Sequence, residues 1–128
     1  MTETIIAVDD LSITTPTGRP LVGDAAFHLG RGEVVLLVGA SGSGKSTIIN
    51  ALSGLLDAEG DHEGWSVSGR VEVAGRRYDL AVERCNVGGL VFQNNALLDD
   101  LSAGGNTRIA ADHLGAVDPR ISDLIARL

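Results

Sequence analysis

Cysteine is nearly absent from this sequence, which contains only Cys85 and therefore cannot form a disulfide within the chain. Such usage fits a reducing compartment, and we interpret Cys85 as a buried packing residue. No apolar run approaches the roughly 18 residues that a membrane-spanning helix needs. Residues 1–4 show no basic stretch ahead of an apolar segment, so no export signal is visible. These absences predict a cytoplasmic protein with no direct membrane insertion.

Positive charge is also scarce. Ten basic residues stand against 17 acidic ones, which gives a net charge of −7. A broad electrostatic grip on nucleic acid is therefore not expected. Hydrophobic residues make up 44% and charged residues 21% of the chain, a globular profile. Domains commonly run to about 100–200 residues, so the chain forms one domain at most, and any positive charge for a phosphate ligand must be local.

Residues 39–47, with the sequence GASGSGKST, are the most informative stretch, because they fit the pattern GxxxxGK[ST] at every fixed position. The short, β-branched run that precedes them predicts a buried parallel strand over Glu33–Val38. Apolar residues then recur at helical spacing and predict a helix with one packing face. They are Ile48, Ile49, Leu52, Leu55 and Leu56. An ordinary Gly/Ser-rich turn is the alternative, and the strand before and helix after it favour a phosphate-binding loop.

The chemistry of such a loop follows from its residue types. Glycines let the backbone curl so that successive amides point at a polyphosphate, and the helix presents its positive end to the same anion. We expect Lys45 to reach the β and γ phosphates, Ser46 to ligate magnesium and Thr47 to contact the α phosphate region. The predicted nucleotide-binding residues are Gly39, Ala40, Ser41, Gly42, Ser43, Gly44, Lys45, Ser46 and Thr47.

The remaining chain predicts more strands and then helices. We expect an antiparallel pair at the edge of the sheet, beside the strand at 33–38, then a hairpin and another apolar strand. In order, these are Ile5–Ile13 with Leu21–Leu29, Ser66–Val73 with Arg76–Leu80, and Val87–Phe92. Further on, helical spacing predicts two helices. Their apolar positions are Ile109 with His113, and Ile121, Leu124, Ile125 and Leu128.

The order of these features, completed by the Gly-Leu-Val-Phe-Gln run at 89–93, resembles the ATP-binding cassette (ABC) family. It is most similar to the N-terminal portion of the nucleotide-binding subunits of bacterial ABC transporters. The segment from Leu90 to Asn106 looks like that family's Q-loop region, and Ala51–Leu55 looks like its continuation of the phosphate-loop helix. The resemblance covers nearly the whole chain from Ile5 onward.

This resemblance implies an α/β fold of the P-loop NTPase class, namely an ABC-type nucleotide-binding domain. It would hold an antiparallel edge sheet, a parallel core sheet and the start of a helical subdomain, incomplete at the C-terminus. Residues 1–128 would be the N-terminal part of one ATP-binding domain. Residues 5–92 would form the core with the P-loop, and residues 93–128 the Q-loop and the start of the helical subdomain.

In function, the resemblance implies an ATPase with ATP and Mg²⁺ as cofactors and Lys45 and Gln93 as catalytic residues. Gln93 would contact magnesium and the attacking water, which a neutral amide can do through its oxygen; the alternative is a polar residue that ends a strand. The implied partners are a transmembrane permease subunit and a second ATP-binding subunit in a head-to-tail dimer. The chain would then lie at the inner face of the cell membrane through the permease.

Several features depart from the family pattern. The family usually places an aromatic residue near position 15 to stack on adenine, whereas Thr14, Thr15 and Pro16 stand here. We expect Trp65 and Tyr78 to be too far along the chain to replace it. The family's signature loop, Walker B acids and switch histidine would follow Leu128, so we expect this chain to bind nucleotide better than it cleaves it. The alternatives are a non-transport ABC ATPase and a nucleotide-binding fragment without turnover, with a P-loop kinase or GTPase less favoured.

Overall fold

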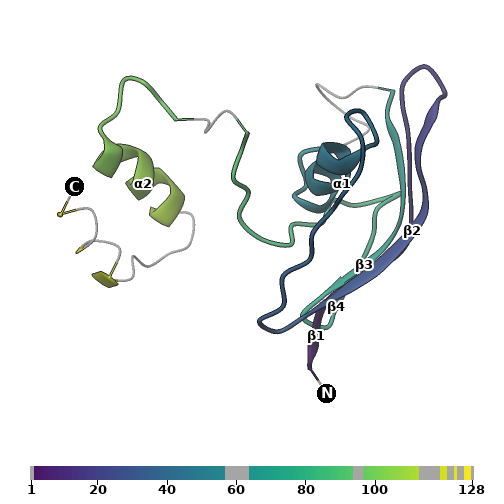
Figure 1. The fold of residues 1–128 in the computed structure, drawn as a ribbon, viewed down its shortest axis with the longest axis horizontal. Coiled ribbons are helices and arrows are strands. Elements are labelled where there is room, and N and C mark those ends of the chain that lie inside the picture. Colours follow the sequence, from purple (N-terminus) through teal and green to yellow (C-terminus); the bar gives the residue numbers. More distant parts are fainter. Residues whose placement is uncertain are drawn as a thin grey trace. The chain divides into compact units, whose positions relative to one another are not determined.

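The computed structural model describes residues 2–56, 64–93, 97–112, 119–120, 123 and 126–127. The chain separates into two compact units, Met1–Leu90 and Val91–Leu128 (Figure 1). Among the residues that the structure describes, the first unit contains a four-stranded sheet and the helix α1, and the second unit contains the helix α2. This division is geometric, so the functional boundary between residues 92 and 93 stays a prediction.

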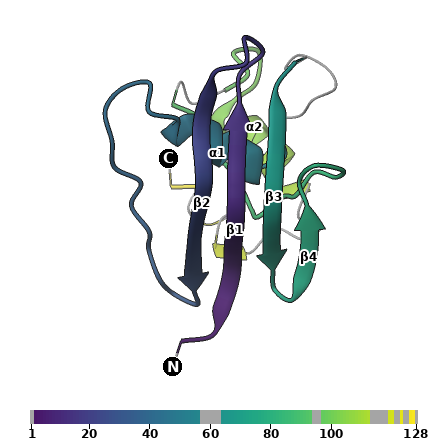
Figure 2. The ribbon, with the colours of Figure 1, turned by 90° about the vertical axis from the view of Figure 1, so that its right-hand side faces the viewer.

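The sheet of the first unit is antiparallel throughout, with the strand order β2-β1-β3-β4 (Figure 2). Its strands are β1 (Thr4–Thr14), β2 (Pro20–Gly30), β3 (Ser66–Val73) and β4 (Arg76–Asp79). Consecutive strands are joined by short turns in the pairs β1–β2 and β3–β4, and β1 then pairs with β3. The predicted antiparallel pair and the predicted hairpin are both confirmed.

The core lies between this sheet and the helix α1 (Lys45–Leu52), which covers one face of the sheet (Figure 2). Val8 of β1 pairs with Val71 of β3, and each side chain is 1% exposed. Farther along β1, Leu11 and Ile13 are fully buried. The step from position 8 to 11 breaks the two-residue alternation of a strand, because the pairing register shifts between Asp9 and Ser12. This bulge keeps the apolar side chains of β1 on the face covered by α1.

Gly69 of β3 lies against this bulge. A Cβ atom built on it would lie 2.8 Å from the Cα of Leu11 and 2.9 Å from the carbonyl oxygen of Asp10, and its φ is +128°. Both the close backbone approach and the positive φ exclude a side chain without strain. A glycine is therefore required where β3 crosses the bulge.

Cys85 is 1% exposed and belongs to the same core. Its Sγ atom lies 3.5 Å from the carbonyl oxygen of Leu52 and 3.8 Å from that of Ala51, at the C-terminal end of α1. Burial raises the pKa of the Cys85 thiol, a backbone hydrogen bond opposes this effect, and the charge of Glu83 adds to the rise in pKa. The interpretation of Cys85 as a packing residue is confirmed.

Two predicted strands are wrong for this structure. Neither Glu33–Val38 nor Val87–Phe92 forms a strand, and all pairing among the described residues is antiparallel, so the parallel core sheet is not formed there. Val34, Leu36 and Val38 are 93%, 78% and 85% exposed. A strand that is apolar on both faces is stable only when neighbouring strands satisfy its backbone and cover its side chains. No described residue pairs with 33–38 in this way, and the segment remains extended chain.

The second unit contains the helix α2 (Ala103–Asp112), which confirms the helical spacing predicted around Ile109. Ser102 precedes α2, and its Oγ accepts a hydrogen bond from the amide of Gly105 at 3.1 Å, as an N-cap does. The Asn106 side chain accepts a bond from the Leu98 amide at 2.8 Å and donates to the carbonyl oxygens of Leu98, Leu101 and Ser102. Asn106 thus fixes the turn that leads into α2.

The helix predicted from Ile121, Leu124, Ile125 and Leu128 lies on residues outside the described part, as does His113. Within the described part, neither helix has the length and apolar character needed to span a bilayer.

Candidate nucleotide-binding site

The loop at 39–44 is positioned by its contact with the start of β2. A Cβ atom built on Gly44 would lie 3.1 Å from Cγ2 of Val22 and 3.3 Å from Cγ of Leu21, and the φ of Gly44 is +96°. The loop therefore rests directly on β2, and a side chain at position 44 would press on Leu21 and Val22 and adopt a strained φ. The carbonyl oxygen of Gly44 accepts the first hydrogen bond of α1, from the Ile48 amide at 2.9 Å, so α1 begins where the loop ends.

The loop curls back on itself. Gly42 has a φ of +78°, in the left-handed region that favours glycine. A Cβ atom on Gly39 would lie only 2.7 Å from Oγ of Ser43, so the first and fifth residues of the loop approach each other closely. The Ser43 amide donates to the carbonyl oxygen of Ala40 at 3.2 Å and closes the turn. The predicted curl of the backbone is present in the structure.

Lys45, the only lysine in the sequence, folds back over this curl. Its Nζ atom donates to the carbonyl oxygens of Gly39 at 2.7 Å and Ala40 at 2.8 Å, and lies 3.5 Å from Oγ of Ser43. The ammonium is thus held above the start of the loop rather than extended into solvent. One full positive charge lies beside the glycine backbone, where an anion bound to the loop would sit.

Two hydroxyls follow Lys45 in the first turn of α1. Ser46 is exposed and Thr47 is half-buried, and this turn contains no acidic residue that would offset the positive end of the helix. The donor set fits a magnesium–triphosphate group, because amides and an ammonium suit phosphate oxygens, and a hydroxyl oxygen suits a hard cation. Among the described residues no group of three or more His, Cys, Asp or Glu side chains could hold a metal ion, so the fit rests on these hydroxyls.

Gln93 lies in the second unit and is exposed. Ser46 belongs to the first unit. Its predicted role as a magnesium ligand and catalytic residue stays a prediction, as do the predicted roles of the residues at 39–47.

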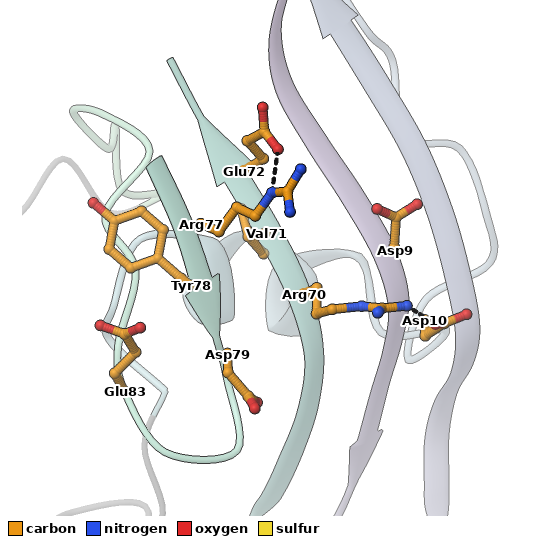
Figure 3. Close-up of a pocket in the computed structure, with 9 residues that line it drawn as sticks. All are labelled: Asp9, Asp10, Arg70, Val71, Glu72, Arg77, Tyr78, Asp79 and Glu83. Carbon is orange, nitrogen blue, oxygen red and sulfur yellow. Dashed lines mark hydrogen bonds and ion pairs between the residues drawn. The ribbon is translucent and has the colours of Figure 1, made fainter. Parts of the chain in front are cut away.

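A charged hollow of about 740 Å³, which the sequence analysis did not predict, lies over β1, β3 and β4 (Figure 3). Asp9 follows the inward-facing Val8, and Arg70 precedes the inward-facing Val71. Because side chains alternate along a strand, Asp9 and Arg70 lie on the face opposite α1. The full lining is Asp9, Asp10, Arg70, Val71, Glu72, Arg77, Tyr78, Asp79 and Glu83.

Both arginines of the hollow are engaged by carboxylates. Arg70 pairs with Asp10 and Arg77 pairs with Glu72, each at 2.9 Å, and all four side chains are substantially exposed (Figure 3). Exposed pairs of this kind contribute little to stability. With its arginines neutralised and further carboxylates present, the hollow does not suit a polyphosphate, which leaves the loop at 39–47 as the candidate site. The alternating charges of β3 and β4 predict a charged face here, but not its concave shape.

Comparison with known proteins settles the family. The family model described as ABC transporter matches residues 22–128. The chain belongs to the ABC transporter family. The resemblance drawn from the phosphate-binding loop and the Gly-Leu-Val-Phe-Gln run is confirmed, and this family has the P-loop NTPase fold and ATPase activity in general.

Three relatives show the extent of the similarity. The macrolide export ATP-binding/permease protein MacB of Bartonella henselae is 35% identical, over 98% of this chain and 20% of its own length. MacB of Pectobacterium atrosepticum is 40% identical, over 82% of this chain and 16% of its own length. An uncharacterized ABC transporter ATP-binding protein, y4fO of Sinorhizobium fredii, is 34% identical, over 97% of this chain and 35% of its own length. The chain thus spans about a third or less of these relatives, and no solved structure matches it.

Proposed function

We propose that this chain binds ATP with magnesium at residues 39–47 and serves as the ATP-binding part of an ABC transporter. The observation that carries the proposal is the curled loop with the Lys45 ammonium folded over its carbonyl oxygens. Family membership supports it, because ABC proteins bind ATP, usually with Mg²⁺.

The proposed role of each residue follows from the hydrogen-bond donors and oxygen ligands at the loop. The Lys45 ammonium exchanges its carbonyl partners for β and γ phosphate oxygens, which carry full negative charge and therefore form stronger bonds. The Ser46 hydroxyl and the Gln93 side-chain oxygen would hold magnesium, and Thr47 would contact the α phosphate region. Bound magnesium would supply positive charge that neutralises the phosphates.

The proposed partners are a transmembrane permease and a second ATP-binding subunit. The names of the MacB relatives combine ATP binding with a permease, which supports coupling of nucleotide binding and hydrolysis to transport. In this proposal the chain lies at the inner face of the cell membrane, and Gln93 orients the attacking water.

Thermal unfolding of the chain with and without Mg-ATP tests the proposal. A ligand that binds only the folded state stabilises it by about 2.7 kcal/mol at 100 times its Kd, so we expect a clear rise in the midpoint. Lys45→Ala should abolish this rise, because it removes the full positive charge that lies against the loop. Arg77→Ala, which removes an equal charge from the opposite face of the sheet, is the matched control and should retain it. The proposal is contradicted if Mg-ATP does not change the unfolding midpoint of the unmodified chain, or if the Lys45→Ala variant shows the same rise in midpoint.

A further inference from the structure

Trp65 lies beside the turn between β1 and β2. Ser66, the next residue, pairs with Thr14, which is the last residue of β1. On the other side of Trp65, a Cβ atom built on Gly64 would lie 3.0 Å from Cβ of Pro16 in the same turn. Trp65 lies 49 positions after Pro16 in the sequence, but antiparallel pairing of β1 with β3 places the two residues in neighbouring segments.

The phosphate-binding loop rests at this same end of the sheet. Gly44 packs on Leu21 and Val22, and Thr14 pairs with Pro20. The ends of β2, β1 and β3 lie next to one another in that order, so two strand spacings, about 10 Å, separate the loop contact on β2 from the start of β3.

Trp65 and the loop also share one face. The Trp65 side chain packs against the buried cluster that includes Val22, Ala51 and Leu52, so it lies on the face covered by α1. Trp65 is only half-buried, so part of the residue remains accessible.

The other aromatic residues of the first unit do not occupy this position. Phe27 pairs with Val8 in the middle of its strand, and Tyr78 lies on β4 under the guanidinium of Arg76, 4.8 Å from the ring centre. Within the turn, Thr15 and Thr17 bond each other through their hydroxyls at 2.9 Å and offer no flat apolar face. Trp65 is therefore the aromatic side chain that the topology brings to the loop.

We infer that Trp65 stacks on the purine base of the nucleotide whose phosphates lie on residues 39–47, an inference that rests on the proposed function. The ribose spans the interval between the loop and the indole. An accessible indole face binds a base by stacking and by burial of apolar surface. The inference is an alternative to our expectation from the sequence that Trp65 is too far along the chain to hold the base.

Trp65 is the only tryptophan in the chain, so its intrinsic fluorescence reports on this contact directly. We expect Mg-ATP to change its emission in a saturable manner. Inorganic tripolyphosphate, which has no base, should compete for the loop without producing this change. An equal change in emission with both ligands, or binding of ATP without any change, overturns the inference.

Substitution supplies a second measurement. Trp65→Leu should weaken ATP binding about tenfold, as the loss of a stacked base does, and should leave tripolyphosphate affinity unchanged. Trp65→Phe should retain most of the affinity. Tyr78→Leu removes another half-buried aromatic ring from the same core and is the matched control, with no expected effect on either ligand. If Trp65→Leu binds ATP as the unmodified chain does, the inference fails while the proposed function stands; if tripolyphosphate and ATP both fail to bind the unmodified chain, the proposed function itself fails.

Discussion

The four-stranded sheet and the segment at 33–44 have similar apolar content but opposite environments. In the sheet, Leu11 and Ile13 are fully buried and pair with neighbouring strands. In the segment, Leu36 is 78% exposed, and the chain runs without a strand partner among the described residues to the loop that carries Lys45. The difference shows that hydrophobicity alone does not bury a strand.

The contrast in burial follows from how far along the sequence each strand's pairing partner lies. The strands of each sheet pair β1–β2 and β3–β4 are joined by a turn, so pairing requires little loop closure. A parallel strand must instead pair with segments that lie at least a crossover connection away in sequence. The segment at 33–38 therefore depends on distant partners, whereas both hairpins of the antiparallel sheet are local, and the β1–β3 pairing joins the two hairpins.

The largest expected effect comes from one leucine in each region. Leu11→Ala should lower the free energy of unfolding by about 3 kcal/mol, because it removes a fully buried side chain and leaves a cavity. Leu36→Ala, the matched control in the exposed segment, should change the unfolding free energy by less than about 0.5 kcal/mol. Urea unfolding of both variants measures the difference. Equal losses would mean that Leu36 is packed as tightly as Leu11.

Alanine substitution of one glycine in each region should have a smaller effect on the free energy of unfolding. Gly69→Ala should cost about 2 kcal/mol, because the new Cβ would press on the backbone of the β1 bulge at a strained φ. Gly42→Ala also places alanine at a positive φ, but nothing lies within 4 Å, so only the backbone strain of about 1 kcal/mol is expected. Chemical denaturation would contradict this ranking if the Gly42 variant lost more stability than the Gly69 variant.

The sequence predicted local structure well and long-range pairing poorly. Alternation and turn residues located all four strands of the sheet, and the motif located the loop and the helix that follows it. The parallel strands failed because a continuous apolar run such as Val34–Val38 specifies burial without specifying partners. The position of Trp65 could not be predicted for the same reason. It depends on the pairing of Thr14 with Ser66, and a strand register is a property of two segments.

The smallest predicted effect is a dependence of the free energy of unfolding on pH, which arises from a buried thiol in the packed region. Cys85 is buried in the core, where no charged or other polar side chain is buried among the described residues, and burial raises its thiol pKa above the ordinary 9.0. Below pH 9 the folded and unfolded states both keep the proton, so no loss of stability arises from this thiol. As pH rises further, the unfolded thiol ionises first, so the free energy of unfolding falls until the folded thiol also ionises. Cys85→Ala removes the titrating group, so its unfolding free energy should fall less between pH 8 and pH 10 than that of the unmodified chain, whatever the cost of the cavity. Parallel pH profiles for the two chains would show that the thiol reaches solvent, and would place Cys85 with the exposed segment rather than with the core.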